Sequence, residues 1–363
     1  MESLGLNSEK RFWQNKNVLI TGHTGFKGSW LALWLTQLGA NVSGLSLVEP
    51  VSNPNMYSAL GIDKLVIDDR GDIIHPDICF NKIKKAKPEI IFHMAAKSLV
   101  RESYSDPLTT YNTNVIGTAN MMEAARACES VKIIVVITTD KCYENIEQDY
   151  AYVETDPLGG HDPYSSSKAC AEHVAIAYYR SFFKEKGVGL ATARAGNVIG
   201  GGDWSADRLI PDAVKAWSKN EKLTIRYPQA TRPWQHVLEP LSGYLTLAEH
   251  LWISPEKYSG AWNFGPDQNS VKTVKDMVEL AVQVWDDSAE WESSNDNHLH
   301  EAGLLQLNSD KARLLLGWEP NMNFDKAVTE TIHWYREYYS NNLVMKKLTL
   351  NQITEYEGEA VHT

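Results

Sequence analysis

A doubly wound α/β fold, with helices on both faces of a parallel sheet, is the fold class that this sequence predicts. Three observations lead to it. Short apolar runs alternate with segments of helical spacing over the first half of the chain. The run IIVVI, within residues 131–138, has no polar face, as in a strand that is buried on both sides. A glycine-rich turn at residues 22–28 separates the first run from the first helical segment, which is typical of the start of such a sheet.

The individual elements are justified by the spacing of their apolar residues. Aliphatic runs bounded by polar residues or glycine predict strands, and apolar residues three and four positions apart predict helices. We therefore expect strands at residues 17–21, 41–47, 65–67, 89–93, 131–138 and 187–194, and helices at residues 26–38, 109–127 and 164–184.

The pattern changes after about Gly196. A run of three glycines, residues 200–202, follows, and nine of the 12 tryptophans lie between Trp204 and Trp334. We expect residues 1–196 to form the sheet domain and residues 197–345 mainly a smaller α/β lobe. A helix at residues 237–251, in a segment near 237–260, is expected to return to the sheet domain. Residues 346–363 are expected to be a polar, frayed C-terminal tail.

Composition argues against several classes of partner. The chain has 35 Lys and Arg against 46 Asp and Glu, a formal net charge of −11, which does not favour binding to nucleic acid or to an anionic membrane. No apolar run approaches the roughly 18 residues that cross a bilayer. Residues 1–10 are polar and carry no signal segment, so we expect a cytoplasmic protein. The four cysteines form no Cys-x-x-Cys pair and no zinc-binding spacing, so we expect reduced thiols and no metal.

The turn after the first strand carries glycines at Gly22, Gly25 and Gly28, in the spacing G-x-x-G-x-x-G. Glycines let a phosphate approach the backbone, and the following helix N-terminus supplies free N–H groups. The turn, with His23, Phe26 and Lys27 between its glycines, therefore predicts a dinucleotide pyrophosphate site; the alternative is a turn that only packs a helix on a strand.

The end of the second strand, residues 43–47, has neither an acidic residue for the adenosine ribose nor an arginine for a 2′-phosphate. This favours NAD over NADP only weakly, and it predicts that the dinucleotide is held loosely.

Two further signals carry acid–base chemistry. Tyr164 and Lys168 are four residues apart in a predicted helix, which places the phenol and the ammonium on one face, although such a pair also arises by chance. The ammonium is expected to lower the phenol's pKa, so that Tyr164 can exchange a proton with a hydroxyl. Thr139, Asp140 and Lys141 follow the IIVVI strand, at the carboxyl end where ligands gather in such sheets.

This combination resembles the extended short-chain dehydrogenase/reductase family over nearly the whole chain. The resemblance implies a Rossmann NAD-binding domain in which Lys168 also holds the nicotinamide ribose. It further implies that Asp72 and Ile73 contact the adenine and that Ala95, Ala96 and Lys97 form a turn over the cofactor. Ser98, at the end of that turn, is expected to reach the substrate.

Within the family, sugar-nucleotide 4,6-dehydratases carry Thr-Asp-Glu where this chain has Thr139-Asp140-Lys141. The Glu-to-Lys change and the segment GHTGFKGSW most resemble the branch of these dehydratases that acts on CDP-glucose. The resemblance implies that Tyr164 and Thr139 act in C4 oxidation and that Asp140 protonates the leaving C6 hydroxyl. Lys141 is either the base at C5 or a cation that stabilises the C4 enolate.

The second lobe is expected to bind the nucleotide sugar. Arg208 and Arg232 are candidates for its diphosphate, Asn197 for phosphate or sugar hydroxyls, and His236 lies in a segment, RPWQHV, that is similar to the same branch. Each arginine is as readily a solvated surface residue, and Trp204 and Trp234 are more readily core residues than ligand contacts.

The resemblance also implies an assembly and a pathway. The predicted helices at 109–127 and 164–184 carry apolar residues on more than one face, and related proteins pair these helices into an intersubunit bundle. We expect a homodimer, with a homotetramer as the alternative, that serves deoxysugar and lipopolysaccharide biosynthesis. The alternative activities are a 4-epimerase or decarboxylase of the same family, and a non-catalytic dinucleotide sensor.

Overall fold

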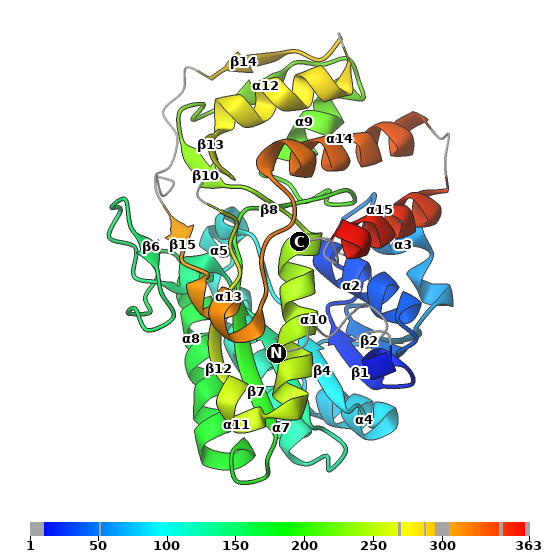
Figure 1. Cartoon of the computed structure of the whole chain (residues 1–363), viewed down its shortest axis with the longest axis vertical. Helices are drawn as coiled ribbons and strands as arrows, with labels where there is room; N and C mark the ends of the chain where they lie inside the picture. Colours follow the sequence, from blue (N-terminus) through cyan, green and yellow to red (C-terminus); the bar gives the residue numbers. More distant parts are fainter. Residues whose placement is uncertain are drawn as a thin grey trace.

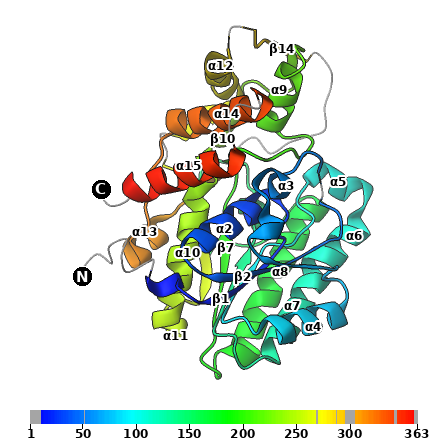
Figure 2. The ribbon, with the colours of Figure 1, turned by 90° about the vertical axis from the view of Figure 1, so that its right-hand side faces the viewer.

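The computed structural model describes residues 11–50, 52–267, 270–286, 288–294, 305–340 and 344–359. A large α/β domain carries a smaller lobe at one end (Figures 1 and 2). The polar N-terminal segment, residues 1–10, lies outside the described residues.

A seven-stranded parallel sheet, with strand order β12-β7-β5-β4-β1-β2-β3, forms the centre of the large domain and confirms the predicted fold class. Its strands are β1 (Asn17–Thr21), β2 (Asn41–Ser46), β3 (Ile67–Arg70), β4 (Ile90–His93), β5 (Ile133–Ile137), β7 (Gly189–Arg194) and β12 (Gly260–Asn263). The strand expected at residues 65–67 lies later, at β3, because this edge strand is charged and has no apolar run to mark it. Strand β12 was not predicted; it extends the returning segment to Asn263.

Both faces of the sheet are covered. Ile133, Val135 and Ile137 of β5 pack into one buried cluster with α2 (Phe26–Gln37) and α10 (Leu238–Ile253). Ile134 and Val136 face the other cluster, with α4 (Pro76–Ala86), α7 (Gly117–Arg126) and α8 (Pro163–Tyr178). The apolar IIVVI run is therefore explained by burial on both sides.

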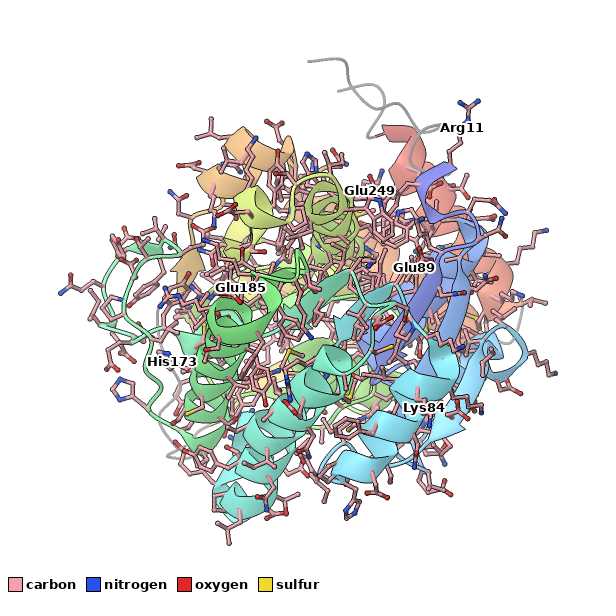
Figure 3. All side chains as sticks on the ribbon, turned by 90° about the horizontal axis from the view of Figure 1, so that it is seen from below. Arg11, Lys84, Glu89, His173, Glu185 and Glu249 are labelled. Atoms are coloured by element: carbon pink, nitrogen blue, oxygen red, sulfur yellow. The ribbon has the colours of Figure 1, made fainter. Side chains whose placement is uncertain are left out.

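The helix expected at residues 109–127 is interrupted. It consists of α6 (Pro107–Tyr111), a π-helical turn at Asn112–Ile116, and α7. A second π-helical turn, Tyr179–Phe183, follows α8. Seen from below, α7 and α8 lie side by side (Figure 3). This domain also contains α3 (Met56–Leu60), α5 (Val100–Ser105) and α11 (Pro255–Tyr258).

The smaller lobe contains α9 (Leu209–Trp217), α12 (Val274–Trp285) and α14 (Phe324–Ser340) with two short ladders. In these ladders β9 (Leu223–Ile225) pairs with β14 (Trp291–Ser293), and β10 (Thr231–Pro233) pairs with β13 (Val271–Thr273). Two further ladders join the lobe to the large domain: β8 (Val198–Ile199) with β11 (Gln235–His236), and β6 (Ala151–Tyr152) with β15 (Gln306–Leu307), which precedes α13 (Asp310–Leu316). No described helix is long and apolar enough to cross a bilayer.

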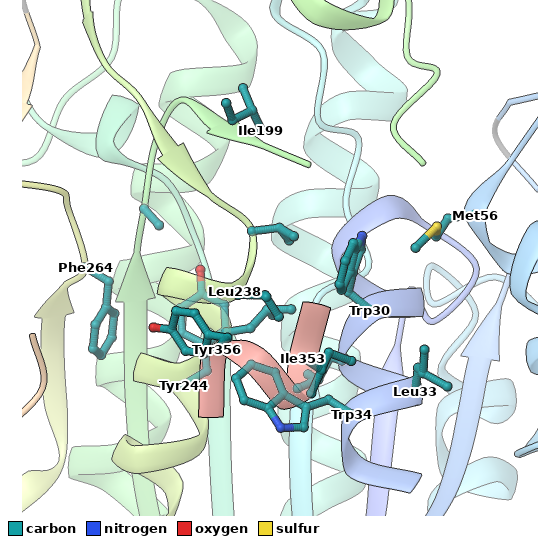
Figure 4. Close-up of a cluster of buried hydrophobic side chains, with 14 of the residues drawn as sticks. Trp30, Leu33, Trp34, Met56, Ile199, Leu238, Tyr244, Phe264, Ile353 and Tyr356 are labelled. Atoms are coloured by element: carbon teal, nitrogen blue, oxygen red, sulfur yellow. The ribbon is translucent and has the colours of Figure 1, made fainter. Parts of the chain in front are cut away.

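The expectation of a frayed C-terminal tail is wrong for α15 (Met345–Glu359). This helix packs on α2, α3 and α14, and its Leu348, Ile353 and Tyr356 are buried. Figure 4 shows Ile353 and Tyr356 beside Trp34 of α2, whose indole N–H donates to Glu357 at 2.7 Å. A few apolar residues in a polar sequence are enough to dock the helix because α2 and α10 supply the matching surface. Residues 360–363 lie outside the described residues.

Glu239 of α10 ties this docked helix to the core. One carboxylate oxygen accepts the backbone N–H groups of Met322 (2.6 Å) and Asn321 (3.0 Å), and the other accepts the Tyr356 hydroxyl at 2.8 Å. Burial raises the pKa of Glu239 to about 7.

We predict that Glu239 makes the protein less stable as the pH rises from about 4.5 through about 7. A carboxyl whose pKa is raised in the folded state stabilises the fold while it is protonated, and that contribution is lost on ionisation. Glu239→Gln keeps the contacts, since the amide can donate to Tyr356. The difference in unfolding free energy between variant and wild type should grow by on the order of 3 kcal/mol between pH 5 and pH 8, measured by urea denaturation. A pH dependence in Glu239→Gln equal to that of the wild type would contradict the prediction.

Candidate active site

A pocket of about 1200 Å³ opens where the carboxyl ends of the parallel strands meet the smaller lobe. Its walls include the turns after β1, β4, β5 and β7 and the smaller-lobe segments around α9 and β9. The volume exceeds the roughly 300–1,000 Å³ of an ordinary small-molecule site. The pocket therefore has room for two ligands side by side.

The glycine-rich turn lies on one wall of this pocket and has the shape that a dinucleotide pyrophosphate needs. Gly22 has a φ of +78°, and a Cβ there would lie 2.9 Å from the backbone nitrogen of Ala95. A Cβ on Gly28 would lie 2.2 Å from the Gly22 carbonyl oxygen. Gly25 caps α2 without a side-chain hydrogen bond, so the first N–H groups of the helix are available to a ligand, beside Phe26 and Lys27. These features fit the cofactor that the sequence predicts.

His23 does not line the pocket, contrary to its prediction as a cofactor contact. Its ring is fully buried, with Nε2 2.7 Å from an Asp68 oxygen and Nδ1 2.9 Å from the Ser46 hydroxyl. A Cβ on Gly44 would lie 2.2 Å from the ring. Desolvation lowers the pKa of His23, although Asp68 acts in the opposite direction. The ring therefore anchors the turn to β2 and β3, a role that only the packing of the sheet reveals.

The residues expected to contact the adenosine and those of the expected cofactor turn lie in the same pocket. Asp72, Ile73, Ala95, Ala96, Lys97 and Ser98 all line the pocket. The sequence analysis missed Asn114, whose carbonyl accepts the Lys97 backbone N–H at 2.8 Å and whose amide donates to the Lys97 carbonyl at 2.9 Å. The amide also donates to the Ser167 hydroxyl at 2.8 Å. Asn114 thus fixes the turn against α8; a buried asparagine within a predicted helix was the available signal.

The residues after β5 form a short turn at the floor of the pocket. Asp140 is 1% exposed, and one of its carboxylate oxygens accepts the Thr139 hydroxyl at 2.9 Å. The other oxygen is buried and has no hydrogen-bond partner among the described residues. A Cβ on Gly196 would lie 1.8 Å from that oxygen, so the glycine is what makes room for it. Asp140 is therefore placed to exchange a proton with a ligand hydroxyl.

Tyr164 and Lys168 lie in the first turns of α8, which begins at Pro163 and is capped by Asp162. The Lys168 ammonium donates to the Ile137 carbonyl at 2.9 Å. Burial lowers the pKa of Lys168 to about 8. Burial also raises the pKa of Tyr164 to about 12, although hydrogen bonding with Thr139 and the charge of Arg208 act in the opposite direction. The expected lowering of the phenol's pKa is therefore outweighed by desolvation.

Two further lysines line the pocket. Lys141 follows Asp140 and is half-buried. Lys27, predicted as a cofactor contact, also faces the catalytic end. Burial lowers its pKa to about 8, and the nearby charges of Arg208 and Lys168 add to the effect while Asp140 opposes it. The cationic character of this end of the pocket thus comes partly from the glycine motif itself.

Only some of the second-lobe candidates line the pocket. Asn197, Arg208 and Arg232 line the pocket, and Asn197 has a buried amide nitrogen without a partner among the described residues. Arg208 is paired with Asp203 at 2.8 Å. His236 does not line it: its ring is fully buried edge-on against Trp30, and burial lowers its pKa to about 3. His236 is therefore a core residue.

The two tryptophans differ. Trp234 lines the pocket, whereas Trp204 packs among Trp334, Tyr335 and Tyr338 in the core of the smaller lobe. The sequence analysis missed Arg101, Arg226 and Tyr227 in the pocket wall. They lie in segments without motif or periodicity, so nothing in the sequence marked them. Among the residues that the structure describes, no group of three His, Cys, Asp or Glu side chains could hold a metal ion.

Comparison with known proteins agrees with this geometry. The family model described as GDP-mannose 4,6 dehydratase matches residues 19–331. The chain is 47% identical over 335 residues to the CDP-glucose 4,6-dehydratase of Salmonella typhimurium, covering 91% of this chain and 93% of that protein. It is 24% identical to the dTDP-glucose 4,6-dehydratase of Haemophilus influenzae, covering 88% of this chain and 97% of the relative.

Solved structures share the fold. The dTDP-glucose 4,6-dehydratase of Bacillus anthracis in complex with NAD aligns with a TM-score of 0.73 at 24% identity, over 92% of this chain and 99% of that one. The dTDP-glucose 4,6-dehydratase DesIV of Streptomyces venezuelae, with NAD and TYD bound, aligns with a TM-score of 0.75 at 23% identity, over 91% and 99% of the two chains.

We predict that Gly28→Ala will abolish dinucleotide binding. The new Cβ would meet the Gly22 carbonyl at 2.2 Å, and a backbone atom can yield only if the turn itself moves. Isothermal titration with NAD should detect no binding, while the far-ultraviolet circular dichroism remains that of a folded protein. Gly317→Ala is the control: it is strained by its φ of +67° but has open space around it. It should cost about 1–2 kcal/mol of stability and leave the affinity unchanged. Wild-type NAD affinity in Gly28→Ala would disprove the assignment of the turn.

Proposed function

The chain belongs to the GDP-mannose 4,6 dehydratase family, and we propose that it is a lyase that converts CDP-glucose to CDP-4-keto-6-deoxyglucose with NAD as cofactor. The observation that carries this function is the 47% identity to a CDP-glucose 4,6-dehydratase over 91% of the chain. The pocket holds the groups that the reaction needs: Tyr164, Asp140 and Lys141.

The cofactor's place follows from the glycine turn. The N–H groups at Gly25–Gly28 are available to the pyrophosphate, Asp72 and Ile73 to the adenosine, and Lys168 to the nicotinamide ribose. When bound, NAD would supply reversible hydride chemistry, so that oxidation at sugar C4 and reduction at C6 leave no net oxidation. The second strand, β2, ends at Ser46 rather than at an acidic residue that could hold the ribose, and the Ser46 hydroxyl is hydrogen-bonded to His23. Both features support the expectation of a loosely held dinucleotide.

Tyr164 is the proposed base for the C4 hydroxyl. Because burial raises its pKa to about 12, the phenol is protonated at neutral pH and must lose its own proton before the phenolate can accept that of the C4 hydroxyl. The Thr139 hydroxyl lies beside it and can bond to the same sugar oxygen. The nearby cation Arg208 stabilises the phenolate as it forms.

Asp140 and Lys141 are proposed to act after oxidation. The C4 ketone makes the C5 proton acidic; removal of that proton and protonation of the C6 hydroxyl by Asp140 release water. Lys141 either takes the C5 proton or stays charged and stabilises the enolate. Ser98, Asn197, Arg208 and Arg232 are proposed to hold the nucleotide diphosphate and sugar, since all four line the pocket.

The alternative activities are less well supported. A 4-epimerase needs no acid at C6, yet Asp140, a pocket residue, has an oxygen with no hydrogen-bond partner among the residues that the structure describes. The substrate of a decarboxylase carries a carboxylate where glucose has its C6 hydroxyl, so it offers no C6 hydroxyl for Asp140 to protonate. A non-catalytic sensor does not require the combined presence of Tyr164, Lys168, Thr139 and Asp140 at one pocket.

The deciding experiment is incubation of the protein with CDP-glucose and substoichiometric NAD. A 4-keto-6-deoxy sugar should form over many turnovers, and deuterium placed at C4 should appear at C6. dTDP-glucose and GDP-mannose are the comparison substrates and should react more slowly. Formation of a C4 epimer, or stoichiometric accumulation of reduced nicotinamide, would overturn the proposal.

We predict that Asp140→Asn will oxidise the substrate and then stall. The substitution preserves size but removes the proton donor, and general acid catalysis typically contributes about 10²–10⁴-fold. Stopped-flow absorbance should show reduced nicotinamide accumulating with bound substrate while dehydration slows by that factor. Tyr164→Phe should abolish the absorbance change as well.

Lys141→Met tests whether Lys141 takes part in the reaction, either as the base at C5 or as the cation that stabilises the enolate. If Lys141 is the C5 base or the partner of the enolate, this variant should also accumulate reduced nicotinamide. Normal turnover would remove Lys141 from the mechanism, and loss of the absorbance change in Asp140→Asn would place Asp140 in the oxidation step.

We propose a homodimer, with a homotetramer as the alternative, that is formed through the faces of α6, α7 and α8. Leu108 of α6 is 76% exposed, and Ile116 and Phe182, in the π-helical turns next to α7 and α8, are 50% and 41% exposed, where a partner helix pair would cover them. Sedimentation at micromolar concentration should give a dimer, and Leu108→Asp with Ile116→Asp should give a monomer. A monomeric wild type would refute the proposal.

We further propose that the enzyme acts in the cytoplasm, in deoxysugar synthesis for lipopolysaccharide.

A further inference from the structure

Glu172 lies on α8 four residues after Lys168 and eight after Tyr164, on the same face of the helix. It is 4% exposed and does not line the pocket. Its carboxylate accepts four hydrogen bonds, so neither oxygen is left for a ligand. One oxygen accepts Thr138 Oγ1 and Arg194 Nε (3.0 Å); the other accepts Thr192 Oγ1 (2.6 Å) and Arg194 Nη2 (2.9 Å).

The residues that donate hydrogen bonds to Glu172 connect three parts of the active site. Thr138 is the residue directly before Thr139, so its hydrogen bond holds the end of β5 against α8. Arg194, at the end of β7, also donates to the Tyr143 hydroxyl at 2.7 Å and to the Glu154 carbonyl at 3.3 Å. Tyr143 lines the pocket and donates to Asn263 at 2.8 Å. The ion pair therefore connects α8, the β5 turn and the pocket wall that follows it.

We propose that Glu172 is a positioning residue of the dehydratase, which sets the distance between the β5 turn and α8 through its buried ion pair with Arg194 and keeps Thr139, Tyr164 and Lys168 in reacting geometry. The inference rests on the function proposed above. Breaking a buried pair from one side leaves an uncompensated charge, so such a pair holds two elements in one arrangement.

Glu172 also acts on the charge of Lys168. The titratable groups that face Lys168 are Tyr164 and Glu172 on α8, Cys142 after β5, His93 of β4 and Lys27 of α2. Desolvation lowers the pKa of Lys168, and Glu172 is the largest influence in the opposite direction. Hydrogen bonds from Arg194, Thr138 and Thr192 hold the pKa of Glu172 itself below its usual value despite burial. An ionised Glu172 thus keeps Lys168 protonated.

Two substitutions at this position separate charge from reach. Glu172→Gln keeps the length and removes the charge, so the alkaline limb of the pH–kcat profile should move to lower pH. Glu172→Asp keeps the charge but shortens the side chain, so kcat should fall with the limb near its wild-type position. A misplaced reacting group costs on the order of 10²-fold, and we expect losses of that order in kcat with little change in KM. The C4-deuterium isotope effect on kcat should rise.

A pair of threonines provides the matched control. Thr138→Val and Thr192→Val each remove one hydroxyl bond to the same carboxylate, but only Thr138 adjoins Thr139. Thr138→Val should lower kcat at least 10-fold more than Thr192→Val at similar thermal stability. Glu239→Gln, a buried carboxylate remote from the pocket, should leave kcat unchanged.

Wild-type turnover of CDP-glucose in the same assay tests the function, and the ratios between variants test the positioning role. A titration of the Lys168 ammonium by NMR, in cofactor-free protein, tests the charge coupling even without turnover; its pKa should be lower in Glu172→Gln than in wild type. Equal kcat for the two threonine variants, or wild-type pH profiles in both Glu172 variants, would overturn the proposal. If Glu172→Gln fails to fold, the threonine pair alone decides.

Discussion

The parallel register of the central sheet is the constraint on which the rest of the structure depends. Thr21 of β1 pairs with Leu45 and His93, and Ile137 of β5 pairs with Ala193. The chain therefore leaves all of these strands at one edge. Glycines then permit close approach where the turns meet: Gly22 against Ala95, and Gly196 against Asp140. A side chain at either glycine would push apart two turns that must share one ligand.

Burial of ionisable groups is the second theme of the site. The same desolvation raises the pKa of Tyr164 and lowers those of Lys27 and Lys168, so each group is held closer to neutrality than it would be in water. Glu172, saturated by Arg194 and two threonines, has its pKa held below the usual value instead, and it lies behind the pocket-lining residues rather than among them.

The sequence analysis was most accurate where a short segment carries its own physical requirement. The glycine spacing, the IIVVI strand and the Tyr164–Lys168 pair each demand a local geometry, and all three lie where they were expected. It was wrong where the deciding surface is distant in sequence. His23 and His236 were assigned to ligands because they sit within motifs, yet the ring of His23 fills the space over Gly44, and that of His236 packs on Trp30. The helix α15 looked like a frayed tail because, apart from the adjacent α14, the surfaces it packs on, those of α2, α3 and α10, lie some 90 or more residues away along the chain.

By itself, the sequence determined the fold class and located the dinucleotide turn and the candidate acid–base residues, because strand burial, glycine conformation and helical spacing are properties of neighbouring residues. Only the tertiary structure decided which polar side chains face the pocket and which are buried behind it, since that depends on desolvation by elements from every part of the chain. Asn114 and Glu172 show this most clearly: each is one polar residue in a predicted helix, and each owes its place to hydrogen bonds that only the folded chain can assemble. Tyr164 shows it for chemistry, since the sequence predicts a lowered pKa from its lysine, and the surrounding burial reverses the direction.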